Sequence, residues 1–527
     1  MKIDLIRIFA FNPSLKYVDL GIGCLTAYLR QNGMKVNFQR IELEHKGIAE
    51  ITDFSQAGYF FESWSLPLTL AMIRNDGEGK PLHYGMESVL RKYYKKGLVS
   101  PRIAARSIKD NCARLQKALK LHRNSKAVGF KADCSNAMYV IAASLLLRKM
   151  NPGVKIIYGG PQVSLDYDYS KLALRAGIAD IVVIGEGEKP LLAIARDLKA
   201  GGSGAVEGTL TYNRSAALFM MNHPKSLVNL DELPFPDISD QVMKGETELK
   251  LHANRGCIFF CHFCSYPGVL NRFRQMSPER AVEMIADLYK KHKMRSLMLN
   301  DNAINYSLEW LERFAEEMKK RGPGCKWTAR FSPARPVTAA LAQSLKEAGL
   351  DTVIIGGESL SGRTLKKMNR PCGAKETLAM INTFASLGFR TQVNFIAGFP
   401  GESERDYAQT LRAIRELMEK YENFAANINY FRITMNSYCC LYPQRFGASI
   451  VRADSLAELA GRLKHTVSGT PLYFNLPDNK AGVKRFREMK FACGASRFFY
   501  EKGAVRGLIA KIKRGAKAAD KKLRRKK

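Results

Sequence analysis

Three closely spaced cysteines are the strongest chemical signal in the sequence. Cys257, Cys261 and Cys264 are separated by three and then two residues, directly after a β-rich run. Three thiolates can bind three irons of a 4Fe–4S cubane and leave the fourth iron open, whereas an electron-transfer cluster takes four thiolates. A structural zinc site needs a fourth ligand at zinc spacing, and His262 lies between two of the cysteines, where its geometry is poor. The spacing therefore predicts an iron–sulfur cluster with one open iron.

Polar side chains lie at or near the ends of later β-rich runs. Because the carboxyl ends of parallel strands meet at one edge of a barrel, such groups point into a shared ligand site. Gly356-Gly-Glu-Ser359 ends one of these runs, and Glu358 there is either a ligand contact or a helix cap. The other candidates, by position, are Asp301, Asn302, Arg330 and Asn394.

Two glycine-rich turns mark the corresponding edge in the first half of the chain. Gly159-Gly-Pro161 follows one predicted strand, and Gly185-Glu-Gly-Glu188 follows the next. Glycines at these places let a ligand approach the backbone at the carboxyl edge of a parallel sheet. A dinucleotide site is the alternative, but no Gly-x-Gly-x-x-Gly follows the strand at residues 2–9.

Together these motifs resemble those of the radical S-adenosylmethionine (radical SAM) superfamily, and within it the members that carry a cobalamin-binding domain. The CxxxCxxC motif of that superfamily follows the first barrel strand, and its cobalamin domains carry similar Gly-Gly-Pro and Gly-Glu-Gly-Glu segments. Residues 12–23 are similar to the first loop and helix of those domains. The resemblance covers about residues 1–205 and 249–448, although Gly357 stands where the family usually has Ile.

The resemblance implies how the cofactors are held. The open iron would bind the amino and carboxylate groups of SAM, and the main chain of Phe263 would meet the adenine. Glu358 would contact SAM, and Ile396 and Gly398 would form a backbone wall beside the adenine. The residues implied to bind cobalamin are Gly159, Gly160, Pro161, Gly185, Glu186, Gly187 and Glu188.

One departure concerns the ligand below the cobalt. Cobalamin domains that supply a histidine carry Asp-x-His-x-x-Gly, whereas the segment around His45 lacks both the Asp and the Gly at the required places. We therefore expect base-off cobalamin without a histidine ligand. Asp133 and Ser135, in the loop after the third strand, are the groups expected at its lower face.

The resemblance further implies an enzyme that cleaves SAM with one electron from a flavodoxin- or ferredoxin-type donor. Most cobalamin-carrying members are methyltransferases, so the expected reaction moves a methyl group from SAM, through methylcobalamin, to an unactivated carbon or phosphorus. The first alternative is cyclisation, ring contraction or oxygen insertion without net methylation. A more distant alternative is a non-enzymatic iron–sulfur redox or nucleic-acid-binding protein. Cys439 and Cys440 are the candidates for a catalytic thiol or a second ligand.

The elements that position these residues alternate between strand-like and helix-like runs, which predicts an α/β fold with parallel sheets. Strands are expected at residues 2–9, 35–41, 127–130, 155–158 and 180–184, and then at 249–254, 296–300, 326–329, 352–355, 391–396 and 427–433. We predict a Rossmann-like doubly wound cobalamin-binding domain (1–205, with an insertion at about 42–126), a linker (206–247), a partial (β/α)6 barrel (248–448) and a small C-terminal region (449–527).

The composition narrows the cellular setting. A chain of 527 residues with 46% hydrophobic composition should contain several folded domains. Eleven irregularly spaced cysteines without a secretory leader favour a reducing, cytoplasmic compartment. Apart from those in the two motifs above, the cysteines are expected as small core residues. No apolar run is long enough to span a bilayer, and the net charge of +34 favours anionic partners.

A basic tail ends the chain. Residues 506–527 carry eleven basic side chains against one acidic, and Val505, Leu508, Ile509 and Ile512 recur at helical intervals. One interpretation is a peripheral contact with the inner membrane surface or with an acidic peptide, and the substrate would then be a lipid or such a peptide. The other is a disordered, solubilising segment.

Overall fold

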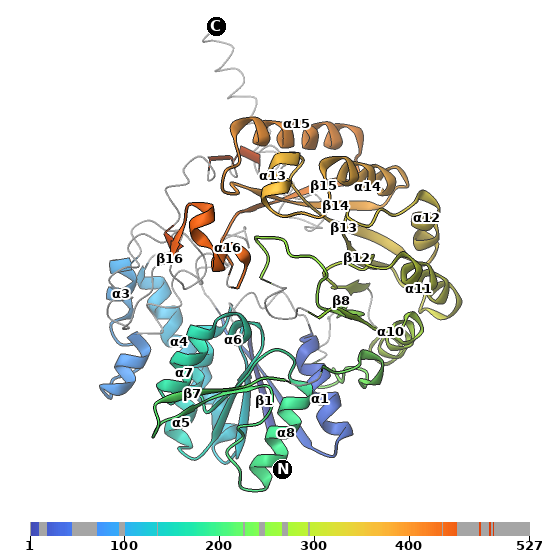
Figure 1. Ribbon diagram of the computed structural model, residues 1–527. Helices are drawn as coiled ribbons and strands as arrows, with labels where there is room; N and C mark the ends of the chain where they lie inside the picture. Colours follow the sequence, from blue (N-terminus) through green and yellow to red (C-terminus); the bar gives the residue numbers. More distant parts are fainter. Residues whose placement is uncertain are drawn as a thin grey trace.

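The chain folds into two α/β lobes, each built on its own sheet (Figure 1). The computed structural model describes residues 2–9, 18–44, 71–93, 101–133, 135–224, 227–241, 248–265, 272–293, 296–434 and 436–450, with the short pieces 474–475, 484–485 and 488–489. The first lobe comprises the described residues up to 224. The second comprises those from 248 to 450, and residues 227–241 connect the two.

The first lobe is a doubly wound sheet, as the alternating pattern predicted. The strand order is β2-β1-β3-β4-β5-β6-β7, and the first five strands are parallel. Their order places the carboxyl ends of β1, β3, β4 and β5 at one edge, where ligands bind in this class of fold. The strands are β1 (Lys2–Phe9), β2 (Lys35–Glu42), β3 (Ala127–Lys131), β4 (Lys155–Gly159), β5 (Ile181–Val183), β6 (Thr209–Asn213) and β7 (Leu218–Asn222).

Alternation within the strands sends side chains to two helical layers. In β1, Ile3 and Leu5 pack with α1 (Leu20–Gln31) and α8 (Glu188–Lys199), whereas Ile6 and Ile8 pack on the opposite side. This is the period of two expected of a strand buried on both faces. The helices of the opposite layer are α4 (Pro101–Leu119), α5 (Ala137–Met150) and α7 (Tyr167–Arg175).

A β-hairpin occupies part of the segment predicted as a linker. Strand β6 pairs antiparallel with β5, and β7 pairs with β6, so the first sheet continues to residue 222. The β6 residues Thr209, Leu210 and Thr211 are buried, whereas β7 is apolar but only half-buried or exposed, with Leu218 61% exposed. The segment looked like a linker because each strand is only five residues long and polar residues, among them Arg214 and Ser215, separate the two.

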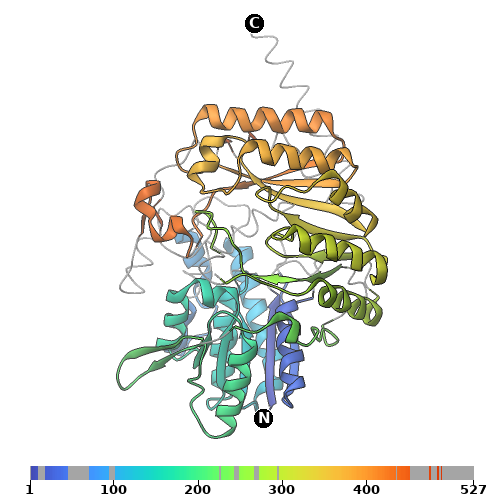
Figure 2. The same ribbon diagram turned by 45° about the vertical axis from the view of Figure 1, so that its right-hand side comes forward.

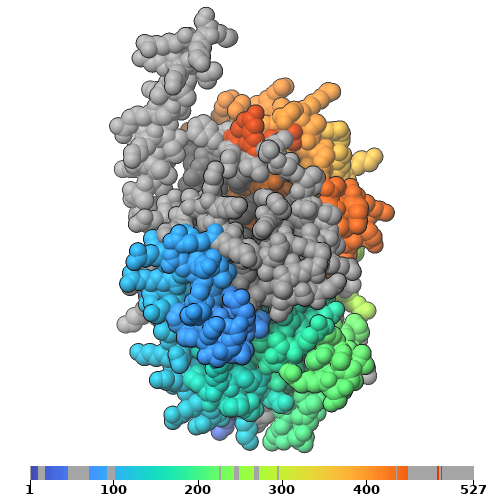
Figure 3. All heavy atoms as spheres, turned by 90° about the vertical axis from the view of Figure 1, so that its left-hand side faces the viewer, coloured from blue at the N-terminus to red at the C-terminus, as the bar shows by residue number. Residues whose placement is uncertain are grey.

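The predicted insertion contributes to the first lobe. Its described parts include α3 (Met86–Tyr93) and α4, and their apolar side chains join the core cluster around α5. Figure 3 shows these segments on the outer surface of the lobe. This part of the insertion therefore covers a sheet face and not the carboxyl edge of the strands.

The second lobe is an open, six-stranded parallel sheet with helices on its outer side (Figure 2). Its order β15-β14-β13-β12-β11-β8 leaves the first and last strands unpaired with each other, which is the predicted partial barrel. The strands are β8 (Glu248–Leu251), β11 (Ser296–Leu299), β12 (Trp327–Phe331), β13 (Leu350–Glu358), β14 (Arg390–Ala397) and β15 (Phe424–Tyr430). The helices are α10 (Pro278–His292), α11 (Leu308–Arg321), α12 (Ala339–Glu347), α13 (Gly362–Lys367), α14 (Ala374–Ser386) and α15 (Glu404–Lys420).

Hydroxyl caps decide where the barrel helices begin. Ser277, Ser307, Thr338 and Ser403 each precede a helix, and each side chain accepts a hydrogen bond from a backbone N–H in the first turn. Such a cap stabilises a helix by about 1 kcal/mol, because it satisfies an amide that has no partner within the helix.

Residues 227–241 join the lobes. Their apolar side chains Val228, Leu230 and Ile238 lie in the core of the barrel, while Gln241 exchanges hydrogen bonds with the backbone of Asp19 at 2.8 and 3.1 Å. Figure 1 shows the carboxyl edges of the two sheets turned toward each other. The connection therefore contributes to both lobes and helps to hold the two edges together.

Several predictions fall outside the described residues: the segment 10–17, His45, Cys134, Cys493 and the basic tail from Val505. Within the described part of the chain, no helix combines the length and the apolar character that a membrane span requires.

Candidate functional site

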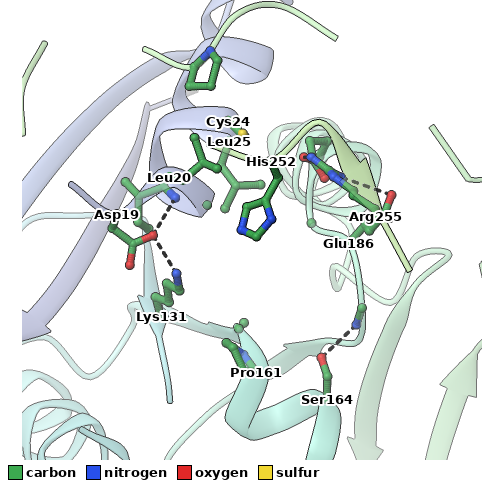
Figure 4. Close-up of a pocket in the computed structure, with 18 of the residues that line it drawn as sticks. Asp19, Leu20, Cys24, Leu25, Lys131, Pro161, Ser164, Glu186, His252 and Arg255 are labelled. Atoms are coloured by element: carbon green, nitrogen blue, oxygen red, sulfur yellow. Dashed lines mark hydrogen bonds and ion pairs between the residues drawn. The ribbon is translucent and has the colours of Figure 1, made fainter. Parts of the chain in front are cut away.

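A cavity of about 800 Å³ lies between the facing edges of the two sheets (Figure 4). This is within the range of cavities that hold cofactors and other small ligands. The first lobe lines it with the glycine-rich turns and a charged group around Asp19, and the barrel lines it with residues that end β8, β11 and β12. Among its lining residues are Arg7, Asp19, Lys131, Asp133, Gly159, Gly160, Pro161, Gly185, Glu186, Gly187, Glu188, Lys250, His252, Arg255, Asn302 and Arg330.

Glycine geometry explains the turn after β4. Gly160 has φ of 101°, and a Cβ there would lie 2.6 Å from the carbonyl oxygen of Ala132, so the close approach requires glycine. At Gly159 and Gly185 a Cβ would meet nothing within 4 Å. The space beside these two backbones is therefore open, as expected of a wall against which a large ligand can lie. Gly185 N also donates to Ser164 Oγ at 2.9 Å, which fixes the second turn.

Asp133 lines the cavity, but its carboxylate already has partners. It accepts hydrogen bonds from Arg7 and from the backbone N–H of Ser135 at 2.9 Å. Ser135 directs its hydroxyl to Asp133 and is not a lining residue. The predicted loop is thus at the cavity, with Asp133 as its nearer member.

Asp19 is the centre of a buried charge cluster. Its carboxylate lies 2.6 Å from Lys131 Nζ and 3.0 Å from Arg7 Nε. Burial would raise the pKa of Asp19, but the neighbouring cations Lys131 and Arg7 outweigh it and hold that pKa below its ordinary value. Asp19 therefore remains ionised, caps α1 and orients Lys131 at the cavity wall.

The two glutamates predicted to contact cobalamin are paired with arginines of the other lobe. Glu188 Oε1 lies 2.6 Å from Arg255 Nη2, and Glu186 Oε2 lies 3.2 Å from Arg255 Nη1. Glu186 also pairs with Arg274. Both glutamates line the cavity, so they occupy the predicted edge but also connect it to the barrel. Neither arginine was predicted from the sequence as a site residue.

The loop with the three cysteines begins at Arg255. Gly256 has φ of 92°, and a Cβ there would approach the carbonyl oxygen of Arg272 to 2.6 Å, so the turn into Cys257 requires glycine. Cys261 and Cys264 follow, and the N–H of Cys264 donates to the carbonyl of Cys261 at 3.0 Å. The cysteines themselves do not line the cavity, but Arg255 and Ser265 on either side of the loop do.

The thiols accept hydrogen bonds from two residues far away in the sequence. Tyr306 Oη donates to Cys257 Sγ at 3.0 Å, and Arg370 Nη1 donates to Cys261 Sγ at 3.3 Å. Among the described residues, no three acidic, His or Cys side chains converge as ligands of a single metal ion. A cubane does not need such convergence, because each thiolate binds its own iron. Three thiols on one short loop are the donor set that a cubane with one open iron takes.

The polar residues predicted at the barrel edge divide into two groups. Asn302 and Arg330 line the cavity; Asn302 donates to the carbonyl of Gly256 at 3.2 Å, and Arg330 to that of Asn300 at 3.2 Å. Asp301 is fully buried and accepts the N–H of Asn254 at 2.7 Å, with its pKa raised by burial to about 7. Asp301 thus holds the end of β8 in place and does not face the cavity.

The remaining predicted SAM contacts lie on β13, β14 and the cysteine loop. Glu358 has φ of 61° and lies beside Arg370; burial raises its pKa despite that arginine. Phe263 and Ile396 pack against one apolar cluster, so the structure brings them together. Gly398 donates its N–H to Glu402 at 3.0 Å, and Asn394 accepts a hydrogen bond from Asn427 at 2.9 Å.

Most of the described thiols outside the loop are buried. Cys439 and Cys440 belong to the same apolar cluster as Phe263 and do not line the cavity. Burial raises the pKa of Cys439 to about 12, so it supplies no thiolate. Cys24, predicted as a core residue, lines the cavity, and burial raises its pKa to about 12 as well.

His252 is another cavity residue that the sequence did not predict. His252 follows β8, and its ring points into the open centre of the site (Figure 4). Its side chain is 35% exposed and lines the cavity. Burial, together with Arg255, Arg330 and Lys131, lowers the pKa of His252 to about 4. A lone histidine after a strand has no sequence signal that separates it from an ordinary core residue.

Comparison with known proteins agrees with these features. Residues 252–414 match the model of the Radical SAM superfamily. An uncharacterized methyltransferase of Pyrococcus horikoshii is 25% identical over 312 residues, which cover 58% of this chain and 67% of the relative. The anaerobic magnesium-protoporphyrin IX monomethyl ester cyclase of Rubrivivax gelatinosus is 23% identical, over 55% of this chain and 54% of the relative. The chain thus spans between about half and two thirds of these relatives.

Two solved structures share the arrangement of both lobes. The radical S-adenosylmethionine methyltransferase TsrM from Kitasatospora setae, solved with cobalamin and a 4Fe–4S cluster, has a TM-score of 0.61 at 13% identity, over 93% of this chain and 90% of that one. The cobalamin-dependent S-adenosylmethionine radical enzyme OxsB has a TM-score of 0.63 at 14% identity, over 93% and 66%. At such identities the likeness shows the fold, and it confirms the fold class predicted from the sequence.

Proposed function

We propose that this chain, a radical SAM enzyme with the fold of the cobalamin-dependent members, transfers a methyl group from SAM to an unactivated carbon or phosphorus of its substrate. One observation supports this most directly. A single cavity of about 800 Å³ joins the glycine-rich edge of the first sheet to the polar edge of the barrel. Passing a group from a cofactor on one edge to a substrate at the other requires both edges to open into the same space.

The two lobes would bind different cofactors. In the first lobe, which the hairpin extends to residue 222, Gly159 and Gly185 would let a corrin ring approach the backbone. In the second, Cys257, Cys261 and Cys264 would hold the cluster, with Asn302 and Arg330 at the adjoining barrel edge. When bound, cobalamin would carry the methyl group, and the cluster would deliver the electron that cleaves SAM.

The test is anaerobic reconstitution of the full chain with iron, sulfide, cobalamin and methyl-labelled SAM. We expect 5′-deoxyadenosine and S-adenosylhomocysteine, and substitution of Cys257, Cys261 or Cys264 by Ala should abolish the first product. Cys325→Ala is a matched control, because that cysteine is buried in the same lobe away from the loop. Undiminished 5′-deoxyadenosine in any one of the loop variants would contradict the cluster assignment.

The second candidate is a cyclisation, ring contraction or oxygen insertion without net methylation. A relative named as a cyclase, aligned over 55% of this chain, supports it. The label separates the two reactions, because a methyltransferase places labelled methyl in the product. Formation of 5′-deoxyadenosine with an unlabelled product would favour this second candidate.

The state of the cobalamin forms part of the proposal. We infer base-off cobalamin without a histidine ligand, because His252 is the one imidazole among the described lining residues and it comes from the barrel. The first lobe lines the cavity with Arg7, Lys131 and Asp133 instead. We also propose a reducing cytoplasmic setting, an electron donor of flavodoxin or ferredoxin type, and contact of the basic tail with an anionic lipid or peptide.

A further inference from the structure

Tyr306 places a hydroxyl against the first cysteine of the loop. The side chain is 7% exposed, and its oxygen lies 3.0 Å from Cys257 Sγ. Its ring is held between Phe259 and Phe273, with ring centres 5.5 and 4.8 Å away. The hydroxyl therefore has little freedom to turn away, and it reaches Cys257 from the loop after β11, 49 residues along the chain.

Arg370 places a positive charge against the second cysteine. Its Nη1 donates to Cys261 Sγ at 3.3 Å, and its Nη2 donates to the carbonyl of Gly356 at 2.6 Å, which fixes the guanidinium plane. A guanidinium keeps its proton in proteins, so Arg370 brings a full positive charge to Cys261. Two cysteines of the loop thus accept hydrogen bonds from donors on two other elements.

Hydrogen bonds to cluster sulfurs have a known electrostatic consequence. One-electron reduction adds a negative charge to the cluster, and part of that charge resides on the thiolate sulfurs. A donor aimed at a thiolate therefore stabilises the reduced state more than the oxidised state, which raises the reduction potential. The effect is larger in a buried site, where the effective dielectric constant is low, and larger still for a charged donor.

We propose that Tyr306 and Arg370 are positioning residues that set the reduction potential of the cluster bound by Cys257, Cys261 and Cys264. Through these hydrogen bonds the chain makes the cluster easier to reduce, so that a protein electron donor can supply the electron for SAM cleavage. The inference rests on the proposed function, because it requires the cluster. It goes beyond that function by naming two residues, outside the cysteine motif, that act through the thiolates.

The test is a reductive titration of the full-length protein loaded with the cluster but without cobalamin, with Ti(III) citrate as reductant and the reduced cluster followed by EPR. Tyr306→Phe keeps the ring and removes only the hydroxyl. We expect this variant to have a reduction potential about 59 mV lower than the wild type, which makes its one-electron reduction tenfold less favourable. Arg370→Gln should lower the potential further. Tyr421→Phe is the control, since its hydroxyl donates to Asn382 at 2.9 Å and not to a cysteine.

A second measurement gives a result that does not depend on how much of each variant is obtained. The reduced wild-type cluster should show an exchangeable proton coupling by pulsed EPR that disappears in D2O and is weaker in Tyr306→Phe. An unchanged potential and an unchanged coupling in a Tyr306→Phe protein with full cluster content would overturn the inference while leaving the proposed function intact. Failure of the wild-type chain to bind a cluster would overturn both.

Discussion

His252 illustrates how a single side chain acquires its properties from the cavity. It lies among Arg255, Arg330 and Lys131, and burial together with these cations lowers its pKa to about 4. The imidazole is therefore uncharged at neutral pH, and its lone pair is available inside the proposed site. An uncharged ring also avoids adding another positive charge to a cavity that already contains several.

The expected result at the residue scale is that His252 stays neutral down to about pH 5. The pKa of His252 in the folded chain lies below the unfolded value of 6.5, so between these two values the unfolded chain binds a proton that the folded chain does not. The free energy of unfolding therefore decreases as the pH falls from 6.5 toward 4. His252→Gln should reduce that acid sensitivity in urea unfolding at pH 5 relative to pH 7. NMR of 13C-labelled histidine should show one ring, absent in the variant, that does not titrate near 6.5.

At the scale of elements, α15 is fixed at its start by Asp406. The carboxylate accepts the Ser403 N–H at 2.9 Å and the Ser361 hydroxyl at 2.7 Å, and it pairs with Arg363. These contacts link the first turn of α15 to the start of α13, directly after the strand that ends at Glu358. The hydrogen bonds from Arg363 and Ser403 hold the pKa of Asp406 below its ordinary value.

We predict that Asp406→Ala lowers the free energy of unfolding by roughly 1–2 kcal/mol at pH 7, the scale of a lost helix cap. Since the pKa in the folded chain is depressed, this contribution is present above the unfolded value of 3.8 and is lost below it. The difference between variant and wild type should therefore shrink in urea unfolding below pH 4. Glu416→Ala, an exposed site on the same helix, should change stability by less than about 0.5 kcal/mol.

Across the whole molecule, four charged residues connect the proposed cobalamin edge to the cysteine loop. Glu186 and Glu188 follow β5, whereas Arg255 and Arg274 belong to the short β-ribbon at the entrance to that loop. The glutamate side chains are 10% and 5% exposed. Removing one residue of such a buried pair leaves the other charge without a partner, which is unfavourable. We therefore infer that these pairs help to hold the two lobes together.

The expected result is a coupling energy between Glu186 and Arg274 of roughly 0.5–3 kcal/mol in a double-mutant cycle, with both residues changed to Gln and stability measured by urea unfolding. The exposed pair Arg313 and Glu279, at 2.6 Å within the barrel, is the control and should show less than about 1 kcal/mol. Coupling no larger than in the control would mean that the charge pairs do not hold the lobes together.

The sequence by itself determined the class of chemistry and the class of fold. Cys257, Cys261 and Cys264 lie within eight residues, and strand periodicity and glycine turns also extend over only a few residues. Each of these patterns can therefore be recognised from a short stretch of sequence. The predicted α/β lobes and partial barrel were confirmed. The β6–β7 hairpin was not predicted, because two strands of five residues separated by a polar turn leave no long periodic pattern in the sequence.

Only the tertiary structure decided which groups meet. Glu188 contacts Arg255, which is 67 residues away in the sequence, and Arg370 contacts Cys261, which is 109 residues away. No periodicity encodes such pairs, because their separation depends on how whole strands and helices pack. The same is true of the pKa of His252, which depends on burial and on cations from both lobes. Local sequence thus specifies the motifs, whereas their electrostatic environment exists only after two distant sheet edges have been packed against each other.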